Sequence, residues 1–127
     1  MLLKVIITYE KRFWAEDIGQ MILLHTEKHK PIELSTSLKE LFNKEKIDSA
    51  TVNTIIEAIH RYDVLPSTNV PTLICWLTGS AALLTEDLGE QVVGQLCHEV
   101  LCDYMNVSSK LSPIIQVLKY DTNLFVI

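Results

Sequence analysis

Residues 3–13 alternate apolar and polar side chains with a period of two, which is the pattern of a β-strand with one buried face. β-Branched and aromatic residues are frequent there, and they favour a strand over a helix. The apolar face would carry Leu3, Val5, Ile7 and Tyr9. The opposite face would carry Lys4, Ile6, Thr8 and Glu10. Lys4 therefore interrupts a segment otherwise suited to burial, which ends in the aromatic pair Phe13 and Trp14.

Further strands are predicted on both sides of the middle of the chain. Residues 20–26 (QMILLHT) form a second strand, and the short connection AEDIG favours its antiparallel pairing with the first. The turn segment 66–71 (PSTNVP) leads into 72–78 (TLICWLT), a continuous apolar run that suits a strand buried on both faces. Gly79 ends that run, and a last strand is predicted over 114–120.

Two short helices are predicted between these strands. The first, over 35–47, begins with Ser and Thr residues that suit a helix start. Its apolar side would carry Leu38, Leu41 and Phe42. The second, over 48–59, repeats this pattern. Its apolar side would carry Val52, Ile55, Ile56 and Ile59.

The longest helix is predicted to begin at Thr85 as N-cap and to end at Asn106. Acidic residues follow Thr85 near the positive end of the helix dipole, namely Glu86, Asp87 and Glu90. A broad apolar stripe runs along the helix. It would consist of Leu88, Val92, Val93, Leu96, Cys97, Val100, Leu101 and Tyr104.

Together these elements indicate an α+β fold with a mixed, largely antiparallel sheet and flanking helices. The length of 127 residues suits one domain that can bury a core. The chain is 48% hydrophobic and 21% charged, with a mean hydropathy of +0.21. Such a composition is that of a folded chain and not of a disordered one.

Charge and composition exclude several partners. The net charge of −5 and the absence of a long Lys/Arg cluster argue against nucleic acid. No apolar run reaches the roughly 20 residues of a membrane helix, and the N-terminus lacks a signal-peptide pattern. The cysteines, Cys75, Cys97 and Cys102, have neither disulfide-framework nor zinc-site spacing, so we expect reduced thiols and a cytoplasmic protein.

Four residues suggest metal or thiol chemistry. His25 and His29 have the spacing of two metal ligands on a helix, but they follow a predicted strand and lack the glutamate of HExxH, so a solvated loop is favoured and no metal is expected. Cys97 and His98 are adjacent, and their side chains would diverge by about 100° on a helix. We therefore expect Cys97 to be a core residue and not a nucleophile.

The remaining candidates are carboxylates and a lysine. Asp63 precedes a turn, and Glu86 and Asp87 suit a helix start, so structural roles are favoured for all three. The chain has no GxGxxG or P-loop motif to hold a phosphate. Lys4 is the one catalytic candidate, although its local pattern alone favours a solvent-exposed strand lysine.

The stretch MLLKVIITYEKRFW resembles a segment of the flavin-containing amine oxidases, which include monoamine, polyamine and spermine oxidases and related histone demethylases. Lys4, the apolar strand, Tyr9 and Phe13–Trp14 match the family pattern in order. The block TLICWLTGSAA resembles the family's strand-Gly-x-x-Ala-helix unit, and the preceding Asp63-Val64-Leu65 is most like the spermine and acetylpolyamine oxidases. SPIIQVLKYDTNLF is similar to the strand that returns to the flavin domain.

The resemblance implies that Lys4 points toward the flavin N5 and holds a water there. In this family a hydride passes from the carbon beside an amine to FAD, water hydrolyses the imine, and oxygen reoxidises the flavin to give hydrogen peroxide. The implied substrate is a small amine or polyamine, and the implied cofactor is FAD. The cofactor-binding residues remain unknown from this sequence.

Some family features are missing from the chain. The dinucleotide-binding fingerprint, the tryptophan expected after the last strand and the flavin-facing C-terminal motif are not found in residues 1–127. We therefore expect residues 1–127 to form a partial amine oxidase domain, a portion of the substrate domain, that is inactive alone and binds FAD poorly. Two alternatives stay open: a non-catalytic protein-interaction module whose apolar ends a protein partner covers, and an incomplete gene model.

Overall fold

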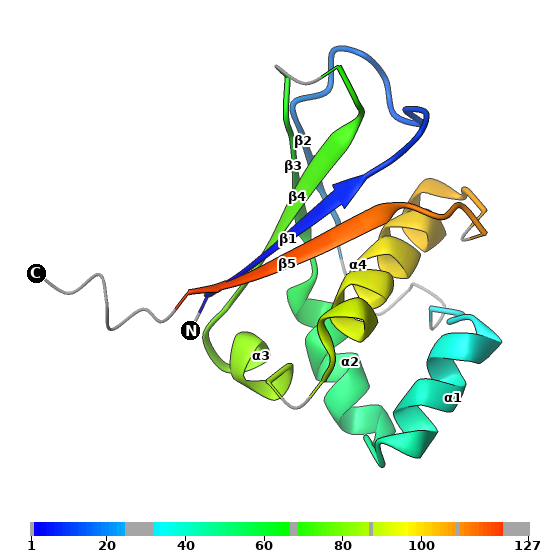
Figure 1. Cartoon of the computed structure of the whole chain (residues 1–127), viewed down its shortest axis with the longest axis vertical. Coiled ribbons are helices and arrows are strands. Elements are labelled where there is room, and N and C mark those ends of the chain that lie inside the picture. The colour runs from blue at the N-terminus through cyan, green and yellow to red at the C-terminus, as the bar shows by residue number, and fades with distance from the viewer. Residues whose placement is uncertain (1, 25–31, 67–68, 87, 109, 121–127) are drawn as a thin grey trace, which may run out of the picture.

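The computed structural model describes residues 2–24, 32–66, 69–86, 88–108 and 110–120, and within these it shows an α+β fold. Four helices lie together on one side of a sheet of five strands (Figure 1). The strands are β1 (Leu2–Thr8), β2 (Gln20–Ile22), β3 (Arg61–Val64), β4 (Thr72–Thr78) and β5 (Ile114–Tyr120). The helices are α1 (Thr36–Lys44), α2 (Ser49–Ala58), α3 (Gly79–Leu84) and α4 (Glu90–Met105).

All neighbouring strands are antiparallel, in the order β2-β3-β4-β1-β5. The central position of β1 and β4 explains their apolar composition, since each is paired on both edges. In β4 the residues Thr72–Cys75 and Leu77 are buried, as predicted for a strand with little solvent contact. The prediction of a strand over 114–120 is also confirmed.

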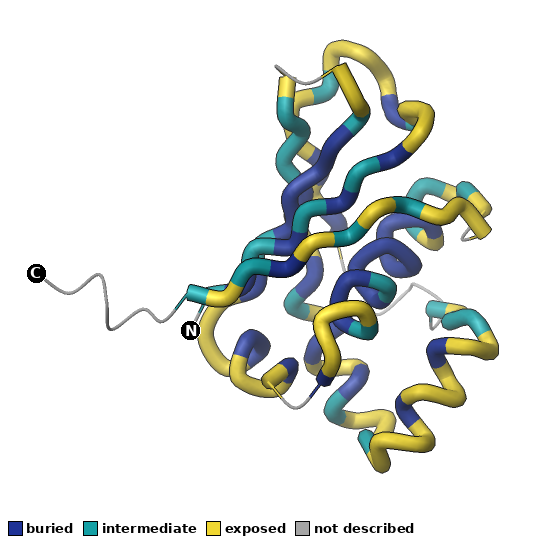
Figure 2. The backbone as a smooth tube through the Cα atoms, in the orientation of Figure 1, coloured by how far each residue is buried: buried dark blue, intermediate teal, exposed yellow. Residues whose placement is uncertain are grey.

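The alternation in β1 separates two sides of the sheet. Leu3, Val5 and Ile7 are fully buried in the core with the helices, as their period-two spacing predicts. Figure 2 shows buried positions concentrated in the middle of the sheet and along α4. The side that faces away from the helices is called the open face below. Strand register places on it Lys4, Ile6, Asp63, Ile74, Trp76, Gln116 and Leu118.

Three helix ends are set by capping residues that can be identified in the local sequence. The Ser35 hydroxyl accepts a hydrogen bond from Leu38 N at the start of α1, and Asp48 Oδ1 accepts one from Thr51 N at 2.7 Å at the start of α2. Asn106 ends α4 in the left-handed conformation with φ 55°. The predicted helices over 35–47 and 48–59 and the predicted stop at Asn106 are thus confirmed.

The predicted start of the long helix is wrong. Thr85 ends the short helix α3, where its hydroxyl donates to Ala82 O at 2.6 Å, and α4 begins later with Gly89 as N-cap. The short helix α3 therefore precedes α4, and the two helices are separate. Glu86 lies in the connection, and Asp87 lies outside the described residues. A threonine is suitable both as an N-cap and at the end of a helix. Residue type alone therefore could not show whether the long helix begins at Thr85 or at Gly89.

The predicted pairing of the first two strands is also wrong. β1 lies between β4 and β5, whereas β2 pairs with β3, a strand that the sequence pattern did not reveal. The described strand β2 is only Gln20–Ile22, and residues 25–26 of the predicted strand lie outside the described part. The connection after β1 instead supplies Trp14, which is buried against Tyr9 and Phe13. A short loop therefore did not imply a hairpin.

Helix α4 packs closely on the edge strand β5. A Cβ atom added to Gly94 would overlap Ile115 Cγ2 and lie 3.2 Å from Ile115 Cβ. Glycine therefore permits the close approach of the helix to the strand. Buried Glu99, five residues further along α4, receives hydrogen bonds from Ser35 N at 2.6 Å and Ser35 Oγ at 2.9 Å. This contact fixes the start of α1 against α4.

Candidate functional site on the open face of the sheet

Lys4 lies in the middle of β1 on the open face. Its strand partners are Trp76 on β4 and Leu118 on β5. The Lys4 ammonium lies 5.5 Å from the centroid of the Trp76 ring, within the range of a cation–π contact. Within the described part of the chain, Lys4 has no carboxylate partner at ion-pair distance. The lysine is half-buried, so it is neither a core residue nor a fully solvated strand charge.

Asp63 lies on the same face and was predicted to have only a structural role beside a turn. It lies near the end of β3, where Gln20 Nε2 donates to Asp63 Oδ1 at 2.8 Å and Arg61 Nε pairs with the same oxygen at 3.2 Å. The hydrogen bond from Gln20 is the largest cause that lowers the pKa of Asp63, and hydrogen bonds from Arg61 and the Trp76 side chain lower it further. Asp63 is therefore a carboxylate at neutral pH.

The open face around these groups is largely apolar. Ile74 is buried between its neighbours Ile6 and Asp63, whereas Ile22 and Ile114 near the two sheet edges are 60% and 74% exposed. No helix of the described chain covers this side. The face thus presents an ammonium over an indole on a broad apolar surface. Such a surface can hold a flat ring or an apolar partner and offer it one hydrogen-bonding amine.

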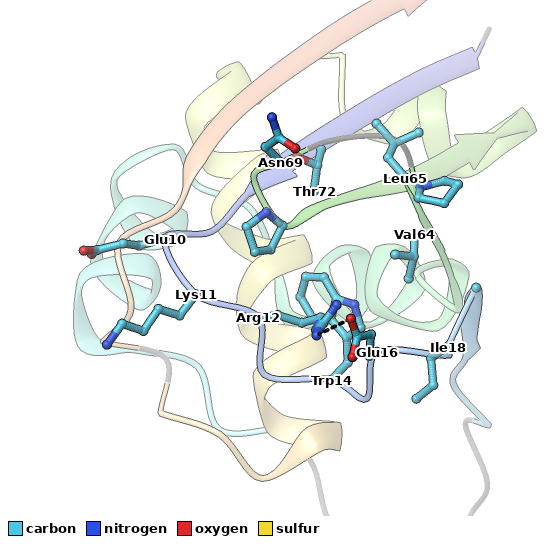
Figure 3. Close-up of a pocket in the computed structure, with 13 residues that line it drawn as sticks. Glu10, Lys11, Arg12, Trp14, Glu16, Ile18, Val64, Leu65, Asn69 and Thr72 are labelled. Carbon is cyan, nitrogen blue, oxygen red and sulfur yellow. Dashed lines mark ion pairs between the residues drawn. The ribbon is translucent and has the colours of Figure 1, made fainter.

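A separate cavity of about 770 Å³ lies beyond the end of the sheet (Figure 3). Its walls are the loop after β1 and the loop between β3 and β4, and Lys4 is not part of its lining. Arg12 and Glu16 point toward one another beside Trp14, with 3.9 Å between Arg12 Nη2 and Glu16 Oε1. This ion pair is exposed and contributes little energy, and the cavity contains no arrangement of groups that indicates chemistry.

The predicted core role of Cys97 is confirmed. The side chains of Cys97 and His98 are both fully buried. The Cys97 thiol contacts Cys75, and this hydrogen bond together with burial raises the pKa of Cys97 well above its ordinary value. His98 Nδ1 is instead hydrogen-bonded to the Tyr9 hydroxyl at 2.8 Å. The two side chains thus face different neighbours, as expected for adjacent helix positions.

One thiol–imidazole contact was missed by the sequence reasoning. Cys102 Sγ lies 3.6 Å from His98 Nδ1, and the two residues are one helical turn apart, a spacing that could have revealed the contact. Burial, with the nearby charge of Glu99, raises the pKa of Cys102 to about 11. Cys102 is therefore a neutral thiol in the core and not an activated nucleophile. All three cysteines are free.

The other candidates add no site. His25, His29 and Asp87 lie outside the described residues, and Glu86 is exposed in the connection between α3 and α4. Within the described ranges, no three His, Cys, Asp or Glu side chains gather in a way that could hold a metal ion. Among the described helices, none is both long and apolar enough to cross a membrane.

The described residues fit FAD only in part. The open face suits contact with a flat ring next to Lys4, but no described glycine-rich turn offers backbone N–H groups to a pyrophosphate. The longest helix, α4, has Glu90 in its first turn, and that carboxylate would repel a phosphate at the helix start. Residues outside the described ones would have to bind the phosphates and ribose.

Comparisons of the chain with models of protein families, with curated proteins and with solved structures found no match. The resemblance to the amine oxidases therefore stays a prediction from the sequence.

Proposed function

We propose that this chain is part of an FAD-dependent amine oxidase of the polyamine or spermine oxidase kind, and that Lys4 is its catalytic lysine. The observation that carries the proposal is the position of Lys4. Its ammonium lies over Trp76 on the apolar open face, without a carboxylate partner among the described residues. β1 is a central strand, so Lys4 neither protects a sheet edge nor pairs with an acidic neighbour in the described part of the chain.

FAD, when bound, accepts the hydride from the amine substrate. In this proposal the residues of the chain hold a water in position for the reaction and keep bulk solvent away from it. Lys4 holds a water by hydrogen bonds through its amine, while Ile6, Ile74 and Leu118 exclude bulk solvent around it. Trp76 keeps the lysine side chain against the sheet. The ligand would be a small amine or polyamine, and nucleic acid and membranes are not partners in this proposal.

We propose further that the isolated 127-residue chain is inactive and binds FAD poorly, because no described part of it provides a phosphate cradle. The complete site would then need residues beyond this chain. A cytoplasmic location belongs to the same proposal, on the basis of the free cysteines.

A second candidate function is a non-catalytic protein-interaction module derived from an amine oxidase. The exposed Ile22 and Ile114 at opposite edges of the open face favour it, because a protein partner could cover this apolar surface. The two functions differ in a simple way. The oxidase needs the Lys4 amine, whereas a module needs only the apolar side chains of the face.

The test uses the longest reading frame that contains this chain. Expressed and purified, it should carry flavin and release peroxide from spermine, and Lys4→Met should slow the flavin half-reactions about 10²-fold. Lys119→Met, at an exposed position on β5, is the matched control and should leave the rates unchanged. A colourless protein, or equal rates for Lys4→Met and Lys119→Met, would refute the oxidase. The 127-residue chain alone should be colourless. A yellow, spermine-oxidising chain would overturn the second part of the proposal.

A further inference from the structure

We infer that two copies of this chain pair through the outer edges of their β5 strands, antiparallel and related by a twofold axis. The two five-stranded sheets would then form one continuous sheet. The inference concerns the 127-residue chain by itself and rests on neither of the functions proposed above. The partner is a second copy because an edge strand offers backbone groups that another strand fits, and because the sequence of β5 is complementary to itself in one register.

β5 is the longer of the two edge strands of the sheet. It has seven residues, whereas β2 at the other edge has three. Figure 1 shows β5 as the outermost strand, beside β1. Within the described chain, no backbone hydrogen bond reaches the outer edge of residues 114–119. Because an antiparallel strand bonds to one neighbour through alternate residues, the remaining N–H and C=O groups of β5 point away from β1.

The sequence of β5 lacks the features that usually protect an edge strand from pairing. Such strands carry several charges, a proline, or a bulge that bends the edge away. In β5 the only charged residue is Lys119, and Pro113 precedes the strand. The pairing with β1 continues without a bulge from Ile114 to Tyr120. Ile114 is 74% exposed on the open face. The edge is therefore long, regular and largely apolar, which favours its pairing with another strand.

One register makes β5 complementary to itself. An antiparallel pair that overlaps over the whole strand is centred on Val117. Ile114 then lies opposite the partner's Tyr120, and pairs of an aromatic with a β-branched residue stabilise sheets. The twofold axis repeats this contact, so the interface contains it twice. Lys119 lies opposite the partner's Ile115, so no like charges meet in this register.

This pairing would place both open faces on the same side of the joined sheet, with the helices of both copies on the other side. Leu118, the neighbour of Lys4 in the register of β1 and β5, would lie opposite the partner's Gln116. The competing arrangement is a dimer in which two open faces stack against one another. Stacking would cover Ile22 as well as Ile114, whereas edge pairing leaves Ile22 in solvent.

The first test is sedimentation equilibrium of the 127-residue chain. One strand pair is a small interface, so we expect a dissociation constant of about 10–100 µM and a mass that approaches twice the 14.4 kDa of one chain. Ile114→Lys removes both contacts with the partner's Tyr120 and should weaken pairing about tenfold. Gln116→Lys, at an exposed position, brings like charges to diagonal neighbours and should weaken it too. Ile22→Lys is the matched control at a 60% exposed position on the other edge, and it should leave the dissociation constant unchanged.

Hydrogen exchange followed by mass spectrometry locates the contact. Protection should increase with protein concentration in peptides that cover residues 114–120 and not in those that cover β2, and Ile114→Lys should reduce this increase. Urea unfolding of the dilute chains should give equal midpoints for Ile114→Lys and Ile22→Lys, because both side chains are exposed.

A chain that keeps a mass of 14.4 kDa at about 200 µM would overturn the inference. A dimer that Ile22→Lys weakens as much as Ile114→Lys would indicate stacked open faces and would overturn it as well. Protection of β2 equal to that of β5 would do the same. None of these measurements depends on flavin, so failure here is distinct from failure of the proposed oxidase.

Discussion

Gly94 lies in the second turn of α4, where the helix passes over Ile115 of β5. A Cβ atom at this position would overlap Ile115 Cγ2 and lie 3.2 Å and 3.3 Å from the Cβ and Cδ1 atoms of the same side chain. Carbon atoms prefer about 3.5–4.0 Å. The overlapped atom is attached directly to Cβ of a β-branched residue, whose rotamer is restricted, so it cannot move aside easily.

We expect Gly94→Ala to destabilise the chain by about 1–2 kcal/mol. Overpacking of a tight site costs about 1–3 kcal/mol. Replacing glycine by alanine inside a helix returns about 1 kcal/mol through helix propensity. The overlap with a branched side chain places the overpacking cost in the upper part of its range. This cost therefore exceeds the free energy gained from helix propensity. Helix α4 and strand β5 would have to separate.

The assay is urea unfolding followed by far-ultraviolet circular dichroism and tryptophan fluorescence. The midpoint should fall in Gly94→Ala with an unchanged slope. Gly19→Ala is the matched control, because nothing lies within 4 Å of a Cβ atom there, and its effect should stay within about 0.5 kcal/mol. Adding Ile115→Ala to Gly94→Ala should recover stability relative to the sum of the single changes, by about 0.5–3 kcal/mol. A Gly94→Ala chain stabilised by about 1 kcal/mol would refute the close packing of α4 on β5.

Three further predictions concern polar groups. Glu99→Gln should lower the free energy of unfolding by about 2 kcal/mol in urea titrations, because the buried carboxylate accepts from both Ser35 N and Ser35 Oγ; an unchanged midpoint would contradict it. Tyr62→Phe should cost about 1 kcal/mol, since the buried hydroxyl donates to Cys97 O at 2.7 Å; thermal unfolding measures this, and a variant as stable as the native chain would argue against it. The pKa of Asp63 is lowered in the folded chain, so its stabilising contribution is present above the ordinary value of 3.8 and is lost as pH falls through the lower folded value. Stability measured from pH 6 down to pH 2 should therefore fall less steeply in Asp63→Asn, and parallel curves would show that the carboxylate contributes nothing.

The fold class and much of the secondary structure could be read from the sequence because they depend on local patterns. Period-two alternation gave the two faces of β1, and the caps Ser35, Asp48 and Asn106 marked helix ends through contacts within three residues along the chain. The core role of Cys97 followed from helical spacing in the same way.

Other features depended on contacts between distant segments. The strand β3 is only four residues long, and its alternation is too short to predict a strand. It nevertheless pairs with β2, whereas the short connection after the first strand had suggested that β1 would do so. Thr85 could cap either helix by its residue type alone, and the packing of α3 and α4 decided which one it joins.

The candidate site likewise combines what the sequence predicts with what only tertiary contacts decide. Sequence by itself identified Lys4 as an unusual residue in an apolar strand, and by resemblance it predicted a catalytic role that stays a prediction. Only the tertiary structure placed Lys4 over Trp76 and brought Asp63 to the same face. Strand order and register decide which side chains share a face, and these are set by packing across the whole sheet. A local pattern can show that a residue faces outward, but it cannot show what it faces.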